Sequence, residues 1–172
     1  MRRLLACLML GCFALVACAA SGPAPVRAAV LPELEVLTLA GQASSLSGEL
    51  AGKVTLIDLW ATWCTACERQ QPKLERLHAA YADRGLRVVG LDVGEAPSVV
   101  RDYLKTHRVT YPVYVDPEFR LADSLGDHQL PTLLLVDRDG RIVQRAAALD
   151  QALLERLKTL LARPGQESAP AH

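Results

Sequence analysis

Two cysteines three positions apart are the residues of this sequence whose types and spacing suit covalent chemistry. Cys64 and Cys67 form a C-x-x-C motif within the run W-A-T-W-C-T-A-C at positions 60–67. At the start of a helix, the free N–H groups and the helix dipole favour an ionised Cys64 thiolate, and one helical turn brings Cys67 beneath it. The motif predicts a redox-active disulfide in which Cys64 is the nucleophile and Cys67 the resolving thiol.

This chemistry requires a buried strand that ends, and a helix that begins, at the motif. Residues 54–61 are nearly continuous in apolar and β-branched side chains, as expected for a strand buried on both faces. Leu74, Leu77 and Tyr81 recur at helical spacing, which predicts an amphipathic helix over residues 65–83 with a kink at Pro72.

The other elements alternate between strands and helices. Residues 34–39, a turn containing glycine and a second extended piece predict a hairpin that covers one end of the sheet. Further along, we expect strands at 86–93 and 113–116, helices at 97–107 and 119–125, a hairpin of 133–137 with 141–145, and a last helix capped by Asp150. This order requires a sheet with helices on its faces and a parallel central pair.

Length and composition predict one domain with a distinct segment at each end. The 172 residues are 51% hydrophobic, enough for one compact domain, which we place at 29–163. Arg2 and Arg3 precede an apolar run at 4–20, the pattern of a secretory signal, so 1–28 is assigned to a signal and a short linker. Residues 164–172 are expected to form a disordered tail.

The 19 basic and 19 acidic residues balance, which argues against a nucleic-acid partner.

Cys18 bears on how the exported protein is retained. The run L-V-A-C at 15–18 resembles the lipobox of bacterial lipoproteins, which predicts lipidation of Cys18. Two alternatives stay open: cleavage at a small residue as late as Ala28, releasing a soluble protein, or retention of the apolar run as a short spanning helix. The predicted location is the bacterial periplasm, either free or as a membrane-anchored lipoprotein on the extracytoplasmic side.

Two other uses of the cysteine pair fit the sequence less well. A zinc site needs about four ligands, but the mature chain has no second cysteine pair and only scattered histidines. A purely structural disulfide between Cys64 and Cys67 would close a ring too small to stabilise the chain appreciably. We therefore expect no metal and no cofactor.

The stretch 54–143 resembles the exported TlpA/ResA-like branch of the thioredoxin superfamily. Three motifs carry the resemblance: W-A-T-W-C-x-x-C, Q-L-P-T at 129–132 and L-D-V-G-E at 91–95. The segment 99–116 matches the helix and strand that this branch inserts. The resemblance implies a thioredoxin-like α/β fold, with a central mixed sheet flanked by helices, an N-terminal β-hairpin extension and this insertion.

The resemblance also implies a substrate-binding surface next to the cysteines. Pro131 would be a cis proline that faces them, and Leu130, just before it, would offer backbone groups to a substrate strand. Thr132 follows in the same motif, and Trp63 stands immediately beside the nucleophile.

Asp58 is the third expected catalytic residue. It precedes Cys64 by six positions, the spacing of thioredoxin's buried acid, and burial in an apolar strand would raise its pKa. Such a carboxyl can relay the proton of Cys67. Many relatives carry asparagine at this position and several carry glutamate where this chain has Gln70, so the acid lies on the strand instead of the helix.

These residues predict an enzyme that reduces protein disulfides outside the cytosol. Its reducing power would come from a membrane electron donor, since the compartment is oxidising. By resemblance, the substrates include the haem-binding cysteines of apocytochrome c, and we expect a monomer. Two alternatives remain: a disulfide oxidase or isomerase that uses the same cysteines, and a redox-inert or copper-handling lipoprotein.

Overall fold

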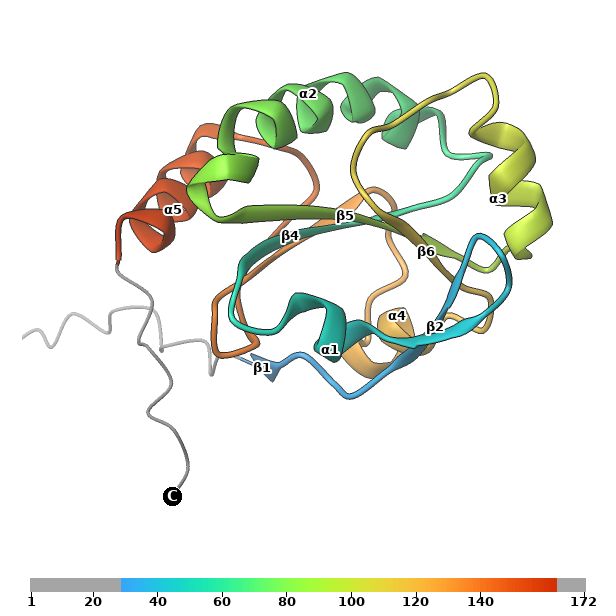
Figure 1. Ribbon diagram of the computed structural model, residues 1–172, viewed down its shortest axis with the longest axis horizontal. Helices are drawn as coiled ribbons and strands as arrows, with labels where there is room; N and C mark the ends of the chain where they lie inside the picture. The colour runs from blue at the N-terminus through green and yellow to red at the C-terminus, as the bar shows by residue number, and fades with distance from the viewer. Residues whose placement is uncertain (1–28, 164–172) are drawn as a thin grey trace, which may run out of the picture.

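The computed structural model describes residues 29–163, which form one mixed sheet with helices on both faces (Figure 1). The strands are β1 (Ala29–Val30), β2 (Glu35–Thr38), β3 (Ala43–Ser45), β4 (Val54–Trp60), β5 (Leu86–Val93), β6 (Val113–Asp116), β7 (Thr132–Val136) and β8 (Arg141–Ala146). The helices are α1 (Leu46–Leu50), α2 (Thr65–Tyr81), the 3₁₀ turn η1 (Ala82–Arg84), α3 (Pro97–Tyr103), α4 (Arg120–Leu125) and α5 (Gln151–Ala162). The expected signal, the predicted lipidation site Cys18 and the expected tail lie outside the described residues.

The strand that precedes the cysteines is the centre of the sheet. The eight strands follow the order β1-β8-β7-β4-β5-β6-β2-β3, with β4 parallel to β5 and antiparallel to β7. All seven side chains of β4 are buried. The predicted buried strand and the predicted parallel central pair are both confirmed, and the fold is thioredoxin-like.

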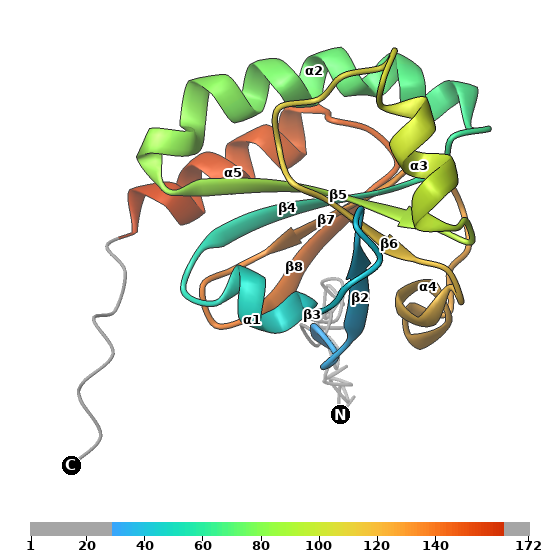
Figure 2. The ribbon, with the colours of Figure 1, turned by 45° about the vertical axis from the view of Figure 1, so that its right-hand side comes forward.

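Helices cover both faces of the sheet. The helices α2 and α5 lie along one face, and α1 and α4 lie against the other (Figures 1 and 2). Leucines of α2 and α5 share one core cluster, while leucines of α1 and α4 belong to another. Burial of these leucines on both faces fixes where β4 ends and α2 begins.

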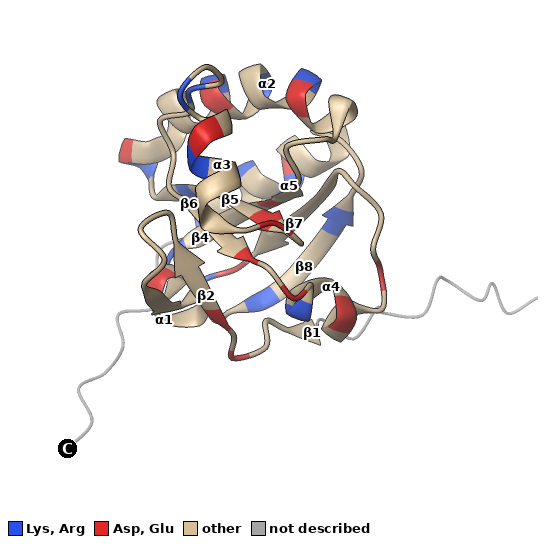
Figure 3. Ribbon diagram, turned by 90° about the vertical axis from the view of Figure 1, so that its right-hand side faces the viewer, with Lys and Arg blue, Asp and Glu red and all other residues tan. Residues whose placement is uncertain are grey.

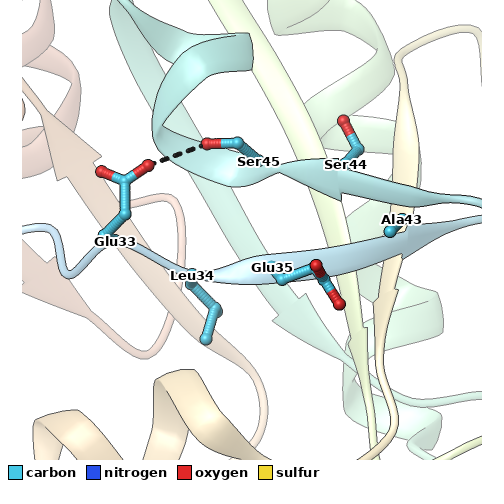
Figure 4. A pocket seen from close by; sticks show the side chains of 6 residues that line it. All are labelled: Glu33, Leu34, Glu35, Ala43, Ser44 and Ser45. Atoms are coloured by element: carbon cyan, nitrogen blue, oxygen red, sulfur yellow. Dashed lines mark hydrogen bonds between the residues drawn. The ribbon is translucent and has the colours of Figure 1, made fainter.

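The predicted N-terminal hairpin is confirmed, since β2 pairs antiparallel with β3, but its place in the sheet differs from the expectation. It does not cover one end of the sheet, because β2 pairs with β6 and so extends the sheet sideways. The second extended piece stops at Ser45, where α1 begins, a helix the sequence analysis did not predict. Ser45 caps α1 by accepting a hydrogen bond from the Gly48 N–H at 3.2 Å. The Glu33 carboxylate accepts a hydrogen bond from the Ser45 hydroxyl at 3.0 Å (Figure 4). It also accepts one from the Ser47 hydroxyl at 2.7 Å, and the two bonds tie α1 to the start of β2.

Helix boundaries depart from the expectation at two places. The helix α2 continues through Pro72 but gives way at Ala82 to η1, which Gly85 ends with a φ of 90°. The helix α3 ends at Tyr103 instead of near residue 107, because its last carbonyls accept from irregular turn N–H groups and the Thr106 hydroxyl.

Charge is mixed over the part of the chain that the structure describes. On the side of the molecule drawn in Figure 3, segments with Lys and Arg and segments with Asp and Glu both occur on the helices and strands. Within residues 29–163, no helix has the length and apolar character needed to cross a membrane.

Candidate active site

The cysteines lie at the junction between β4 and α2. After β4 ends at Trp60, the chain turns so that the Cys64 N–H donates to the Ala61 carbonyl at 3.0 Å. Cys64 is the N-cap of α2, and its Sγ accepts from the Cys67 N–H at 3.2 Å. The structure holds Cys64 and Cys67 as a disulfide.

The two sulfurs differ in their access to solvent. Cys64 is 7% exposed, whereas Cys67 is completely buried beneath it. Both belong to a small apolar cluster with Trp60, Ala61 and Val100, and Leu130 packs against the same cluster. An incoming disulfide can therefore reach Cys64 but not Cys67. In the reduced protein, the dipole of α2, which is 17 residues long, favours the thiolate at its N-terminus.

Asp58 lies in β4 and is completely buried. Burial raises its pKa to about 7, against a smaller opposite effect of a hydrogen bond from Gln70. That bond, from the Gln70 Nε2 to the Asp58 Oδ1, is 3.5 Å long, and the Oδ2 accepts no hydrogen bond from the described residues. The Leu149 N–H donates to the Gln70 Oε1 at 3.2 Å, so the other end of the Gln70 amide, its nitrogen, faces Asp58.

Residues of the predicted substrate surface take up different positions. Trp63 is 67% exposed, although it stands directly beside the largely buried Cys64. The Leu130–Pro131 peptide bond is cis, which confirms that expectation. Thr132 is buried, and its hydroxyl donates to the Gln129 carbonyl at 2.8 Å, so this side chain holds the loop in shape.

A second buried carboxyl near the junction was not among the predicted site residues. Asp92, in β5, pairs in register with Trp60 and is fully buried, and neither of its carboxyl oxygens accepts a hydrogen bond from the described residues. Burial is the largest cause that raises its pKa to about 9, and the nearby negative charge of Glu95 adds to the rise. The L-D-V-G-E pattern marked this strand end in the sequence, but nothing in it indicated the neighbouring junction.

No group of three or more His, Cys, Asp or Glu side chains within residues 29–163 is arranged to hold a metal ion. The chemistry that the described site offers is that of two sulfurs and a carboxyl with a pKa near neutrality.

A thioredoxin-like fold with a C-x-x-C pair at the start of α2 is typical of thiol-disulfide oxidoreductases. The sequence model of the Redoxin family matches residues 23–156, so the chain belongs to this family. It is 30% identical over 114 residues to the thiol-disulfide oxidoreductase ResA of Bacillus cereus (strain ZK / E33L). That match covers 66% of this chain and 65% of the relative, so it spans less than two thirds of the relative's length.

Solved structures agree with this placement. A thiol:disulfide interchange protein of the thioredoxin family from Chlorobium tepidum TLS superposes with a TM-score of 0.65 at 27% identity, covering 81% of this chain and all of that one. A thiol:disulfide interchange protein from Bacteroides sp. superposes with a TM-score of 0.69 at 21% identity, covering 82% of this chain and 92% of that one, and shares the fold. The Bacillus relative confirms the ResA-like resemblance, and the two solved structures confirm the thioredoxin-like fold.

Proposed function

We propose that this protein is an exported thiol-disulfide oxidoreductase that reduces the disulfides of other exported proteins. The observation that carries the proposal is the arrangement at the start of α2, with an accessible sulfur at Cys64, a buried sulfur at Cys67 and the buried carboxyl of Asp58 on the adjacent strand. The name of the Bacillus relative supports the same class of activity.

The reaction begins with the reduced protein. The Cys64 thiolate attacks one sulfur of a substrate disulfide, a mixed disulfide forms, and the other substrate sulfur leaves as a thiolate that takes a proton from water. Cys67 then loses its proton to the Asp58 carboxylate and attacks the Cys64 Sγ. The second substrate sulfur leaves as a thiolate that takes a proton from water, and two electrons have passed from the enzyme to the substrate. The oxidised product is the Cys64–Cys67 disulfide.

Asp58 fits the role of proton acceptor because of its pKa. A carboxyl with a pKa of about 7 is partly ionised at neutral pH, so it can accept the Cys67 proton and later return it. An ordinary exposed aspartate would be too weak a base for a thiol.

We assign the substrate surface to Trp63, which directly precedes Cys64, and to Leu130, Pro131 and Thr132, of which Leu130 packs against the cluster that holds the cysteines. The exposed indole of Trp63 offers an apolar contact to a substrate chain, and the backbone of Leu130 offers hydrogen bonds to it. Among substrates of this kind, we propose the haem-binding cysteines of apocytochrome c, with a membrane protein as the electron donor. The N-terminal signal, with lipidation at Cys18, supplies the exported location.

The test is the equilibrium reduction potential of the Cys64/Cys67 pair, measured by gel shift after titration in a dithiol redox buffer. A value near or below roughly −250 mV supports a reductase, whereas a value above roughly −180 mV identifies an oxidant or isomerase. The absence of a two-electron transition would contradict the enzyme hypothesis. In that case, metal analysis of the reduced protein decides whether it handles copper.

To test the assigned order of attack, the Cys67→Ser variant should accumulate a mixed disulfide between Cys64 and a substrate protein. The Cys64→Ser variant is its matched control and should form none, because the remaining sulfur of Cys67 is buried. Accumulation in the control instead would reverse the two roles.

A further inference from the structure

The junction between β4 and α2 is held from the side by a residue far away in the sequence. The Glu95 Oε2 accepts a hydrogen bond from the Thr62 N–H at 2.6 Å, and the Glu95 Oε1 accepts from the Thr62 hydroxyl at 2.7 Å. Both carboxylate oxygens are therefore bound to one residue, which lies two positions before Cys64. We call this pair of bonds the Glu95–Thr62 clamp.

The turn needs such a clamp because neither neighbouring element holds Thr62. Thr62 lies two residues after the end of β4 and two residues before the N-cap of α2, so its N–H is outside both the sheet and the helix. A backbone N–H left without an acceptor costs free energy, and a carboxylate acceptor gives the stronger, charge-assisted kind of bond. The clamp thus supplies the acceptor that the turn itself lacks.

Glu95 is in turn held in place by the loop that follows β5. Gly94 has a φ of 84°, and a Cβ built on it would collide with the Phe119 ring, which occupies the space where a side chain would be. The Gly94 N–H donates to the Asp116 carbonyl at 2.9 Å. The residue immediately before Glu95 is therefore seated on the neighbouring β6–α4 segment, which restricts where the Glu95 carboxylate can go.

From this geometry, we propose that Glu95 is a positioning residue for thiol–disulfide exchange. By holding the N–H and the hydroxyl of Thr62, it fixes the turn that presents Trp63 and Cys64 to a substrate disulfide. The inference rests on the proposed oxidoreductase function. A misplacement of about 1 Å of a reacting group can slow a reaction by up to about two orders of magnitude, so loss of the clamp should slow exchange without unfolding the domain.

The chain contains a matched control for this proposal. Glu75 binds Thr110 in the same way, with the N–H at 2.6 Å and the hydroxyl at 2.8 Å. Glu75 lies on α2 eight residues after Cys67, about 12 Å further along the helix axis. The Glu75–Thr110 clamp has the same chemistry as the Glu95–Thr62 clamp but does not contact the cysteine turn.

The experiment compares four variants of the protein: Glu95→Gln, Thr62→Val, Glu75→Gln and Thr110→Val. We would measure the single-turnover rate at which each reduced protein reduces the disulfides of insulin, over a range of insulin concentrations. The first two variants should lower the maximal rate about tenfold, and their combination should be no slower than the slower single variant, since both break one clamp. The two control variants should stay within about twofold of the unmodified protein.

Urea unfolding separates positioning from stability. Glu95→Gln and Glu75→Gln should unfold at similar urea concentrations, because each weakens one clamp of the same kind. If the two variants slow insulin reduction equally, or if Glu95→Gln and Thr62→Val add fully, positioning by Glu95 is overturned. Should Glu95→Gln fail to fold, Thr62→Val, which keeps the carboxylate and the backbone bond, carries the same prediction.

A second measurement does not depend on the proposed activity. In a Cys67→Ala background, the pH midpoint for alkylation of Cys64 by iodoacetamide should move in the Glu95→Gln variant and stay unchanged in the Glu75→Gln variant. If the unmodified protein does not reduce insulin, the proposed function fails, and this midpoint still decides whether Glu95 positions Cys64. Equal midpoints in both variants contradict the positioning role.

Discussion

Two buried aspartates on neighbouring parallel strands have different surroundings. Asp58 pairs in register with Gly90, and Asp92 pairs with Trp60, so the two carboxyls lie two positions apart along the β4–β5 pair. Both side chains are completely buried, and burial is the largest cause of the raised pKa of each.

The difference lies in the neighbour that each carboxyl meets. Gln70 donates a hydrogen bond to Asp58 and partly offsets burial, which leaves its pKa at about 7. Glu95 brings a second negative charge to Asp92 and adds to burial, which raises its pKa to about 9. At neutral pH, Asp58 can therefore gain or lose a proton, while Asp92 keeps one. Equal burial thus leads to one carboxyl that can transfer a proton at neutral pH and one that stays protonated.

The largest expected effect is on catalysis by Asp58. Asp58→Asn should slow insulin reduction about 100-fold at pH 7, because the asparagine amide cannot accept the Cys67 proton. Asp92→Asn should change the rate less than about threefold. Equal losses in the two variants would show that burial near the cysteines, and not proton transfer, accounts for the effect of Asp58.

The second expected effect is on the free energy of unfolding, whose dependence on pH should be larger for Asp92 than for Asp58. An unfolded aspartate ionises near pH 4, so above that pH the folded protein holds a proton that the unfolded chain has released. The free energy of unfolding therefore falls by roughly 1.4 kcal/mol per pH unit, until the folded carboxyl also ionises. For Asp58 this fall ends near pH 7, and for Asp92 it continues to about pH 9.

Asp92→Asn should consequently stabilise the oxidised protein by several kcal/mol at pH 8, at roughly 1.4 kcal/mol for each pH unit above about 4, and by nothing measurable at pH 3. Urea unfolding across this pH range checks the prediction. Asp58→Asn is the control, since it should reduce the fall below pH 7 by about half, where both carboxyls contribute, and leave the fall between pH 7 and 9 unchanged. A variant of Asp92 that keeps the fall above pH 7 would contradict the assigned order of the two pKa values.

The sequence predicted the strand of Asp58 and the helix of the cysteines because both depend on local patterns. The apolar run of β4 and the spacing of Leu74 and Leu77 in α2 are visible within a few residues. The helix α1 was missed because five residues offer only Leu46 and Leu50 as apolar positions. The strand β1 has two exposed residues and is a strand only because it pairs with β8, more than a hundred residues later.

The residues of the candidate site also differ in whether a local sequence pattern reveals them. Cys64, Cys67 and Asp58 could be predicted from the spacing within one strand–helix unit and from the family resemblance. The Glu95–Thr62 clamp joins residues 33 positions apart, and its existence depends on the parallel register of β4 and β5. Because no local pattern encodes which turn faces which loop, the surroundings of Asp92 and the clamp required the three-dimensional structure.

A smaller effect is expected in the pH dependence of exchange. The rate of resolution by Cys67 should rise by up to about tenfold as the pH increases from 6 to 8, because Asp58 must be ionised to accept a proton and its pKa is about 7. Stopped-flow measurement of substrate release from the mixed disulfide follows this step. The rise should disappear in Asp58→Asn and persist in Asp92→Asn, and its persistence in both would assign it to another group.

The smallest effect concerns the residue that distinguishes the two carboxyls. Gln70→Leu removes the hydrogen bond that lowers the pKa of Asp58, so the midpoint of the same pH profile should move upward. A bond of 3.5 Å contributes on the order of 0.5 kcal/mol, which corresponds to about a twofold lower rate at pH 6.5. Gln71→Leu, at the next position on α2, is a matched control and should leave the midpoint in place. A downward movement in Gln70→Leu would mean that Gln70 stabilises the protonated form of Asp58, and the contrast with Asp92 would then rest on Glu95 alone.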